Sequence, residues 1–263
     1  MNVPPPELIN ITLDTLTAQV AEWPLSRHKP TLVFIHGAGF HGGFWQPQCP
    51  LAAQFNLVCL NLPGRRTAQP CEADLHVYAD RAEAALAQIG QSVVVIGHSM
   101  GGAVAQILLR RQPSWLAAGV LACTGARLKV APVVNQLFAQ GGAVFMQVFS
   151  QSGPGLSMQQ VAALSQQMAK TQTGISDFMA CNRFDMMAEL VHIKRPCLVV
   201  CGDKDLLTPE KYSQFLHQHI SGSQIALVQG AGHLLPWESP QTFNQLISEF
   251  AHRYESHPVS TSD

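Results

Sequence analysis

The stretch SVVVIGHSMGG, residues 92–102, decides the fold. Its apolar first half predicts a buried strand, and the residues that follow it have the composition of a helix. Between the two, Gly97-His98-Ser99-Met100-Gly101 fits the pattern G-x-S-x-G, which marks a sharp strand-to-helix turn that exposes a serine. The start of a helix also favours negative charge beside the serine hydroxyl. We therefore predict that Ser99 is a catalytic nucleophile.

A serine hydroxyl is a poor nucleophile at neutral pH and needs a neighbouring base. Among the 11 histidines, His233 stands out because it follows the last predicted strand on a glycine-flanked loop, from which its ring can reach the serine. The segment GDKDLLTP, residues 202–209, follows the fifth predicted strand and offers two aspartates that can orient the histidine. We favour Asp205 over Asp203, because Asp205 lies farther into the loop.

Acyl transfer also needs backbone donors for the oxyanion of the tetrahedral intermediate. The segment HGAGF, residues 36–40, follows a predicted strand, and its small residues let the backbone approach a substrate. We predict that the amides of Ala38 and Met100 form this oxyanion hole, with Gly39 as the alternative to Ala38.

Six short apolar runs alternate with helical segments along the chain. The alternation predicts an α/β fold with a mostly parallel sheet covered by helices on both faces. The predicted strands are residues 31–35, 56–60, 92–96, 117–122, 197–201 and 224–228, and the predicted helices are residues 74–89, 101–111, 209–220 and 240–254.

The alternation breaks at residues 125–193, a stretch rich in Gln, Ala, Met and Gly. We interpret it as a helical cap inserted into a core of residues 1–124 and 194–255, with a flexible tail at 256–263. Large apolar residues of the cap can line a pocket or form the cap's own core. They are Met146, Met158, Met168, Met179, Met186, Met187, Phe138, Phe145, Phe149 and Phe178.

The composition fits a globular protein with a large apolar core. Of the 263 residues, 47% are hydrophobic and 13% charged, and the net charge is −1, so the few scattered cations do not predict binding of nucleic acid or membrane. Several of the seven cysteines lie in apolar runs, which indicates buried free thiols and a reducing compartment. We see no signal peptide, no membrane span and no spacing typical of a metal or cofactor site, and we expect a cytoplasmic protein.

The chain resembles the α/β-hydrolase superfamily over residues 9–254. The resemblance rests on four motifs taken together: HGAG after one strand, GHSMGG after another, GDKD with a later proline, and GAGH near the C-terminus. The chain order Ser, Asp, His is also typical of these enzymes. The resemblance implies the α/β-hydrolase fold and a carboxylesterase-like serine hydrolase without cofactor or metal. One departure is NLPGRR, residues 61–66, where the superfamily commonly has D-x-P-G-H-G, and it places Arg65 and Arg66 near the expected cavity rim.

We expect cleavage of small, uncharged, mostly apolar carboxylic esters through an acyl-enzyme intermediate, because the cap carries few charges. A carbon–carbon bond hydrolase or a lactonase would use the same triad. Either arginine facing the cavity would favour a substrate carboxylate, and with it carbon–carbon bond hydrolysis. A non-catalytic ligand receptor is the least favoured alternative.

Overall fold

The computed structural model describes residues 8–150, 155–169 and 173–254, so the predicted flexible tail lies outside the described residues. One eight-stranded sheet has the order β1-β2-β4-β3-β5-β6-β7-β8. Its strands are β1 (Ile9–Leu13), β2 (Leu16–Val20), β3 (Thr31–Ile35), β4 (Asn56–Asn61), β5 (Val93–His98), β6 (Leu116–Ala122), β7 (Cys197–Gly202) and β8 (Gln224–Val228).

The strands from β4 to β8 in this order pair in parallel, whereas β1 and β2 form an antiparallel edge. The predicted α/β architecture with a mostly parallel sheet is therefore confirmed. The sequence analysis missed β1 and β2. Most β1 residues are exposed or half-buried, because β1 is an edge strand, so this segment lacks the continuous apolar run of a central strand.

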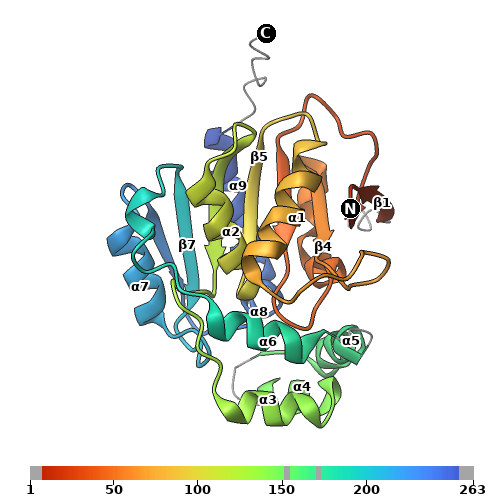
Figure 1. Cartoon of the computed structure of the whole chain (residues 1–263), viewed down its shortest axis with the longest axis vertical. Coiled ribbons are helices and arrows are strands. Elements are labelled where there is room, and N and C mark those ends of the chain that lie inside the picture. The colour runs from red at the N-terminus through yellow and green to blue at the C-terminus, as the bar shows by residue number, and fades with distance from the viewer. Residues whose placement is uncertain (1–7, 151–154, 170–172, 255–263) are drawn as a thin grey trace.

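Helices cover both faces of the sheet, as Figure 1 shows for α1 and α2 on one face and α9 on the other. The α-helices of the core are α1 (Leu75–Ala87), α2 (Met100–Arg111), α7 (Glu210–His219), α8 (Leu235–Glu238) and α9 (Pro240–Ala251). The helices between β6 and β7 are α3 (Pro132–Ala139), α4 (Gly142–Ser150), α5 (Met158–Ala169) and α6 (Gly174–Arg183). These four helices lie together at one end of the sheet, below it in Figure 1. All four fall within residues 125–193, the predicted cap.

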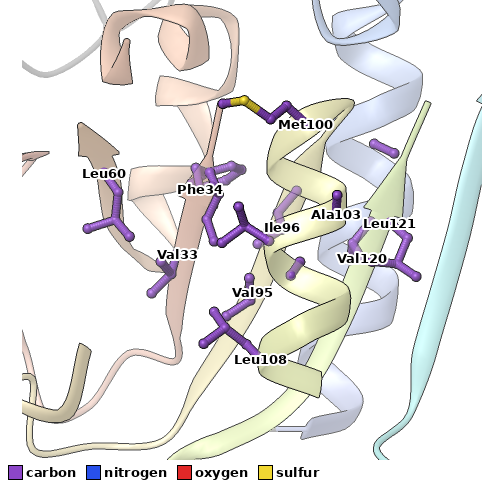
Figure 2. Packing of buried hydrophobic residues seen from close by; sticks show 14 of the residues in the cluster. Val33, Phe34, Leu60, Val95, Ile96, Met100, Ala103, Leu108, Val120 and Leu121 are labelled. Atoms are coloured by element: carbon purple, nitrogen blue, oxygen red, sulfur yellow. The ribbon is translucent and has the colours of Figure 1, made fainter. Parts of the chain in front are cut away.

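Helix α2 lies unusually close to the sheet at the predicted turn between β5 and α2. Val95, Ile96 and Leu108 pack together in the buried cluster of Figure 2. A Cβ on Gly101 would lie 2.1 Å from the carbonyl oxygen of Ile35, a backbone atom that cannot move aside. Only glycine therefore allows α2 to begin at this distance from the sheet.

We predict that Gly101→Ala lowers the free energy of unfolding by more than about 4 kcal/mol, because backbone must shift to admit the methyl group. Gly90→Ala is the matched control. The φ of Gly90 is +70°, so alanine there takes an unfavourable left-handed conformation, but its Cβ would meet nothing within 4 Å. The substitution should therefore lower the free energy of unfolding by only about 1–2 kcal/mol. Urea unfolding of both variants measures the difference, and equal stabilities would contradict the close-packing argument.

Candidate active site

Ser99 occupies the turn between β5 and α2 in a strained conformation. Its φ is +53° and its ψ −117°, a region that residues with a side chain rarely adopt. The backbone is held by hydrogen bonds on both sides: the Ser99 amide donates to the Ala122 carbonyl at 2.9 Å, and its carbonyl accepts from the Thr124 hydroxyl at 2.8 Å. These bonds fix the half-buried serine at the end of the strand.

His233 lies on the loop after β8 and lines the same cavity as Ser99. Its Nδ1 is 2.8 Å from Oδ2 of Asp205, which is almost completely buried. A hydrogen bond donated from Nδ1 to this carboxylate orients the ring. In the tautomer that carries its proton on Nδ1, Nε2 is the basic nitrogen. The structure therefore brings Ser99, His233 and Asp205 to one place from three separate loops.

Asp205 is held as an anion by its own loop. Its Oδ1 accepts the amides of Leu207 at 2.9 Å and Thr208 at 2.8 Å, and its Oδ2 accepts the Thr208 hydroxyl at 2.7 Å. Burial acts to raise the pKa of Asp205, but His233 and the Thr208 hydrogen bonds outweigh it, so the pKa lies below its ordinary value. The sequence analysis missed Thr208, although a threonine three residues after an aspartate is a recognisable turn pattern.

Asp203, the competing aspartate, has a different environment. Its carboxylate accepts the Gly230 amide at 2.6 Å and pairs with the exposed Lys204 at 3.1 Å. These contacts join the loop after β7 to the loop after β8 and do not include His233.

Two further residues that the sequence analysis did not assign to the site hold the His233 loop. Glu238 accepts the amides on both sides of His233, those of Gly232 and of Leu234, the latter at 3.1 Å. Burial raises the pKa of Glu238. His98 is buried, and its Nε2 is 2.8 Å from the His233 carbonyl oxygen. The only sequence signal for Glu238 is its place five residues after the histidine, and it is the last residue of α8.

The predicted oxyanion donors lie on two segments. Ala38 lines the cavity beside Ser99, and Met100 is the first residue of α2, where helix amides have no partner within the helix. The amide of Gly39, the alternative to Ala38, already donates to Oδ2 of Asp177 at 2.9 Å. Asp177 lies on α6 and was not singled out by the sequence analysis.

The cavity of about 290 Å³ at Ser99 is mostly apolar. It continues into a smaller hollow of about 40 Å³, which Ser99 and His233 also line. Most of the large apolar side chains around these spaces come from the cap region and from the loop after β7, and Phe40 and Leu234 add to them from the loops after β3 and β8. Those from the cap region and the loop after β7 are Leu128, Val130, Val134, Phe145, Met146, Met168, Phe178, Leu206 and Leu207.

The cap's methionines and phenylalanines divide between the two roles that the sequence left open. Phe145, Met146, Met168 and Phe178 line the smaller hollow and are also buried against one another or the core. Met158, by contrast, is 87% exposed. The Phe149 side chain lies outside the described part of the chain. Lining the pocket and forming the cap core are therefore not exclusive.

The two arginines of the NLPGRR segment do not line either space at Ser99. Arg65 is fully buried and forms an ion pair with Asp177, and Arg66 is exposed. The arginine that faces inward thus contacts a protein carboxylate rather than the cavity.

Among the described residues, no cluster of His, Cys, Asp and Glu side chains has the arrangement of a metal site. All seven cysteines are free thiols, and six of them are buried. Within the same part of the chain, no helix combines the length and the apolar character that crossing a bilayer requires.

A model of the alpha/beta hydrolase family matches residues 32–246, and the chain belongs to this family. Among curated proteins it is similar to RutD of Escherichia coli O44:H18, named as a candidate carbamate hydrolase, with 26% identity over 83% of this chain and 88% of that protein. The protein described here is accordingly a hydrolase of the α/β-hydrolase type.

Solved structures agree with this fold. A thermophilic esterase is 26% identical, covers 95% of this chain and 99% of its own, and superposes with a TM-score of 0.79. An esterase from Exiguobacterium antarcticum superposes with a TM-score of 0.82 at 17% identity, covering 92% of this chain and 98% of its own. At that lower identity the likeness establishes the fold alone.

We predict that the protein loses stability in acid partly because His36 and His98 are neutral in the folded state. Burial is the main cause that lowers both pKa values, that of His98 to about 3. The unfolded chain binds protons at these histidines below about pH 6.5, whereas the folded protein does not, so stability falls by up to about 1.4 kcal/mol per pH unit for each. For His98 this contribution is present above about pH 6.5 and is lost as the pH falls toward about 3.

The measurement is the free energy of unfolding at about pH 7 and pH 5 for the wild type and for His98→Asn. The variant should show a pH dependence shallower by about 2 kcal/mol over this interval. His76→Gln, at an exposed histidine, is the control and should keep the wild-type slope. A His98→Asn protein with the wild-type slope would refute the assignment.

Proposed function

We propose that the protein is a serine hydrolase that cleaves small, mostly apolar carboxylic esters through an acyl-enzyme intermediate. One observation carries the proposal. Ser99, in its strained turn, lines the same cavity as His233, whose Nδ1 lies 2.8 Å from the buried Asp205 carboxylate. Nucleophile, base and orienting acid are the parts that acyl transfer requires, and the proposed mechanism uses no cofactor or metal.

In the proposed mechanism, Oγ of Ser99 attacks the ester carbonyl carbon while Nε2 of His233 takes the hydroxyl proton. The carbonyl oxygen becomes an oxyanion that accepts hydrogen bonds from the Ala38 and Met100 amides. As the tetrahedral intermediate collapses, the alcohol leaves with the proton from His233. Water then attacks the acyl-enzyme by the same route, with His233 as base, and releases the carboxylic acid and Ser99.

The chemistry of the cavity supports the substrate class. Its walls around Ser99 are mainly aliphatic and aromatic, which suits a short apolar acyl or alcohol group. Arg65 pairs with Asp177 instead of facing the cavity, so neither arginine of the NLPGRR segment is there to bind the carboxylate of a diketone, although Lys129 and Lys211 line the cavity. The thermophilic esterase that is 26% identical to this chain also favours an ester substrate.

A lactonase is the second candidate for the same site. Lactones are cyclic esters and need the same nucleophile and oxyanion donors, so cavity shape alone separates the two activities. The enol-lactonase from Burkholderia xenovorans LB400 superposes with a TM-score of 0.79 over 93% of this chain and 100% of its own, but at 19% identity this establishes the shared fold only.

We predict that the wild type hydrolyses p-nitrophenyl butyrate without added cofactor and that a fluorophosphonate probe labels Ser99. In Ser99→Ala, activity should fall by orders of magnitude to the residual acceleration of about 10³–10⁴-fold over water that binding and the oxyanion hole alone provide. Unchanged activity in this variant would disprove the assignment of the nucleophile.

The ester assignment is tested separately by comparing kcat/KM for neutral short-chain esters, lactones of similar size and a carboxylate-bearing vinylogous diketone. We expect the neutral esters to be preferred. A preference for the diketone of more than about tenfold, about 1.4 kcal/mol of transition-state stabilisation, would replace the ester by carbon–carbon bond hydrolysis.

We predict that Asp205→Asn lowers kcat/KM by about 10³–10⁴-fold, because the amide cannot stabilise the imidazolium that forms at His233. Asp203→Asn is the matched control, since it makes the same chemical change on the same loop away from the histidine, and it should keep kcat/KM within about tenfold. If Asp203→Asn were the more damaging change in a folded protein, the two roles would be reversed.

A further inference from the structure

Asp177 is a fully buried carboxylate on α6, in the predicted cap, and the described hydrogen-bond partners of its side chain belong to the core. Its Oδ2 accepts the Gly39 amide at 2.9 Å and forms an ion pair with Arg65. Its Oδ1 accepts the hydroxyl of Tyr78 at 3.1 Å. One carboxylate thus joins the loop after β3, the loop after β4 and helix α1.

The partners of Asp177 are themselves fixed. Arg65 donates from Nη1 to the Pro63 carbonyl at 2.6 Å, and its guanidinium lies 5.5 Å from the centre of the Tyr78 ring. Burial, followed by the Asp177 carboxylate, raises the pKa of Tyr78 to about 12, so its hydroxyl remains a donor. The network therefore keeps a negative charge in place where water does not reach it.

A buried ion pair is a weak source of stability, because losing hydration offsets most of the attraction between the charges. Here the ion pair matters more for the position of a loop than for stability. One of the three groups bonded to Asp177 is the Gly39 amide, and Gly39 directly follows Ala38. The cap covers the same loop: a Cβ on Gly39 would lie 2.9 Å from Cε of Met168 and 3.1 Å from Cε2 of Phe138. The loop is held by a polar bond and by close apolar contacts.

We propose that Asp177 is a positioning residue for the oxyanion hole: by binding the Gly39 amide from the cap, it fixes the loop so that the adjacent Ala38 amide faces the reacting carbonyl. Arg65 and Tyr78 serve to hold Asp177. This inference rests on the proposed function, and it assigns the cap a part in the chemical step as well as in substrate choice.

The proposal predicts a loss in kcat rather than in KM. An oxyanion donor acts on the transition state, and removing one lowers kcat by about 10²–10³-fold. Replacing Asp177 leaves the Ala38 amide present but misplaced, so we expect a loss of about 10–100-fold in kcat with KM changed by less than about threefold. Affinity for a trifluoromethyl ketone, which mimics the tetrahedral intermediate, should fall by the same factor as kcat/KM.

Two network variants separate positioning from stability. The triple variant Arg65→Met, Tyr78→Phe, Asp177→Leu replaces the network by apolar side chains of similar size, and it leaves the Gly39 amide without its acceptor and the Pro63 carbonyl without its donor. It should unfold near the wild-type temperature but keep the kcat defect. The pair Asp177→Asn, Arg65→Gln retains an uncharged acceptor for Gly39 and should recover kcat to within about fivefold of the wild type.

The assay is p-nitrophenyl butyrate hydrolysis, with thermal unfolding and ketone inhibition measured on each protein. Asp185→Asn, at a half-exposed cap carboxylate that pairs with Arg127 at 3.6 Å, is the control and should retain wild-type kcat. A triple variant with wild-type kcat would overturn the positioning role while leaving the proposed function intact. If the triple variant does not fold, the double variant Arg65→Met, Asp177→Leu takes its place beside the uncharged pair: a kcat defect in this double variant that the uncharged pair does not share supports the role, and equal kcat in the two overturns it.

Failure of the proposed function would look different from failure of this inference. In that case the wild type itself would show no ester turnover and no labelling of Ser99, whatever the network variants do. If the wild type is active and labelled at Ser99, and the network can be made apolar without lowering kcat, only the role of Asp177 is contradicted.

Discussion

The rest of the site depends on the close approach of α2 to the sheet at the β5–α2 turn. Gly97, Gly101 and the carbonyl of Ile35 leave no space for a side chain there: a Cβ on Gly97 would lie 2.3 Å from the Gly101 carbonyl oxygen. This contact forces the chain to turn within one residue, and Ser99 takes the strained φ of +53° that results. A conformation of this kind costs about 1–3 kcal/mol and persists only where the surrounding packing determines it. The buried cluster under α2 supplies that packing.

Around this rigid turn, the other groups stand on loops that are themselves fixed by buried polar contacts. Asp205 is surrounded by donors from its own turn, and Glu238 binds the amides on either side of His233. Buried charges are expensive unless they are paired, so each one constrains the loop that contains it. The geometry of the site thus follows from hydrogen bonds as much as from the sheet.

The sequence predicted the sheet's central strands and the motif-bearing loops because those signals are local. An apolar run, a G-x-S-x-G turn and a glycine-flanked histidine can each be recognised within about ten residues. The edge strand β1 was missed, since its half-exposed residues have no such run. The bond between Gly39 and Asp177 joins residues 138 positions apart, and no spacing pattern in one sequence reports a contact of that range. For the same reason, whether Arg65 faced the cavity or a protein carboxylate was open until the fold was known.

The position of Asp177 changes how the cap's sequence can vary. If the predicted cap only enclosed substrate, its residues would be free to change with the substrate, since the residues proposed for the triad lie outside it. A carboxylate of the predicted cap that is bonded to the loop beside the proposed oxyanion donor makes part of the cap depend on the core's geometry. A shift of α6 that enlarged the cavity would also move the Gly39 anchor, and small displacements at a reacting centre are costly. Substrate preference is therefore easier to alter from cap side chains that line the hollow without joining this network, such as Phe145 and Met146, than from α6 itself.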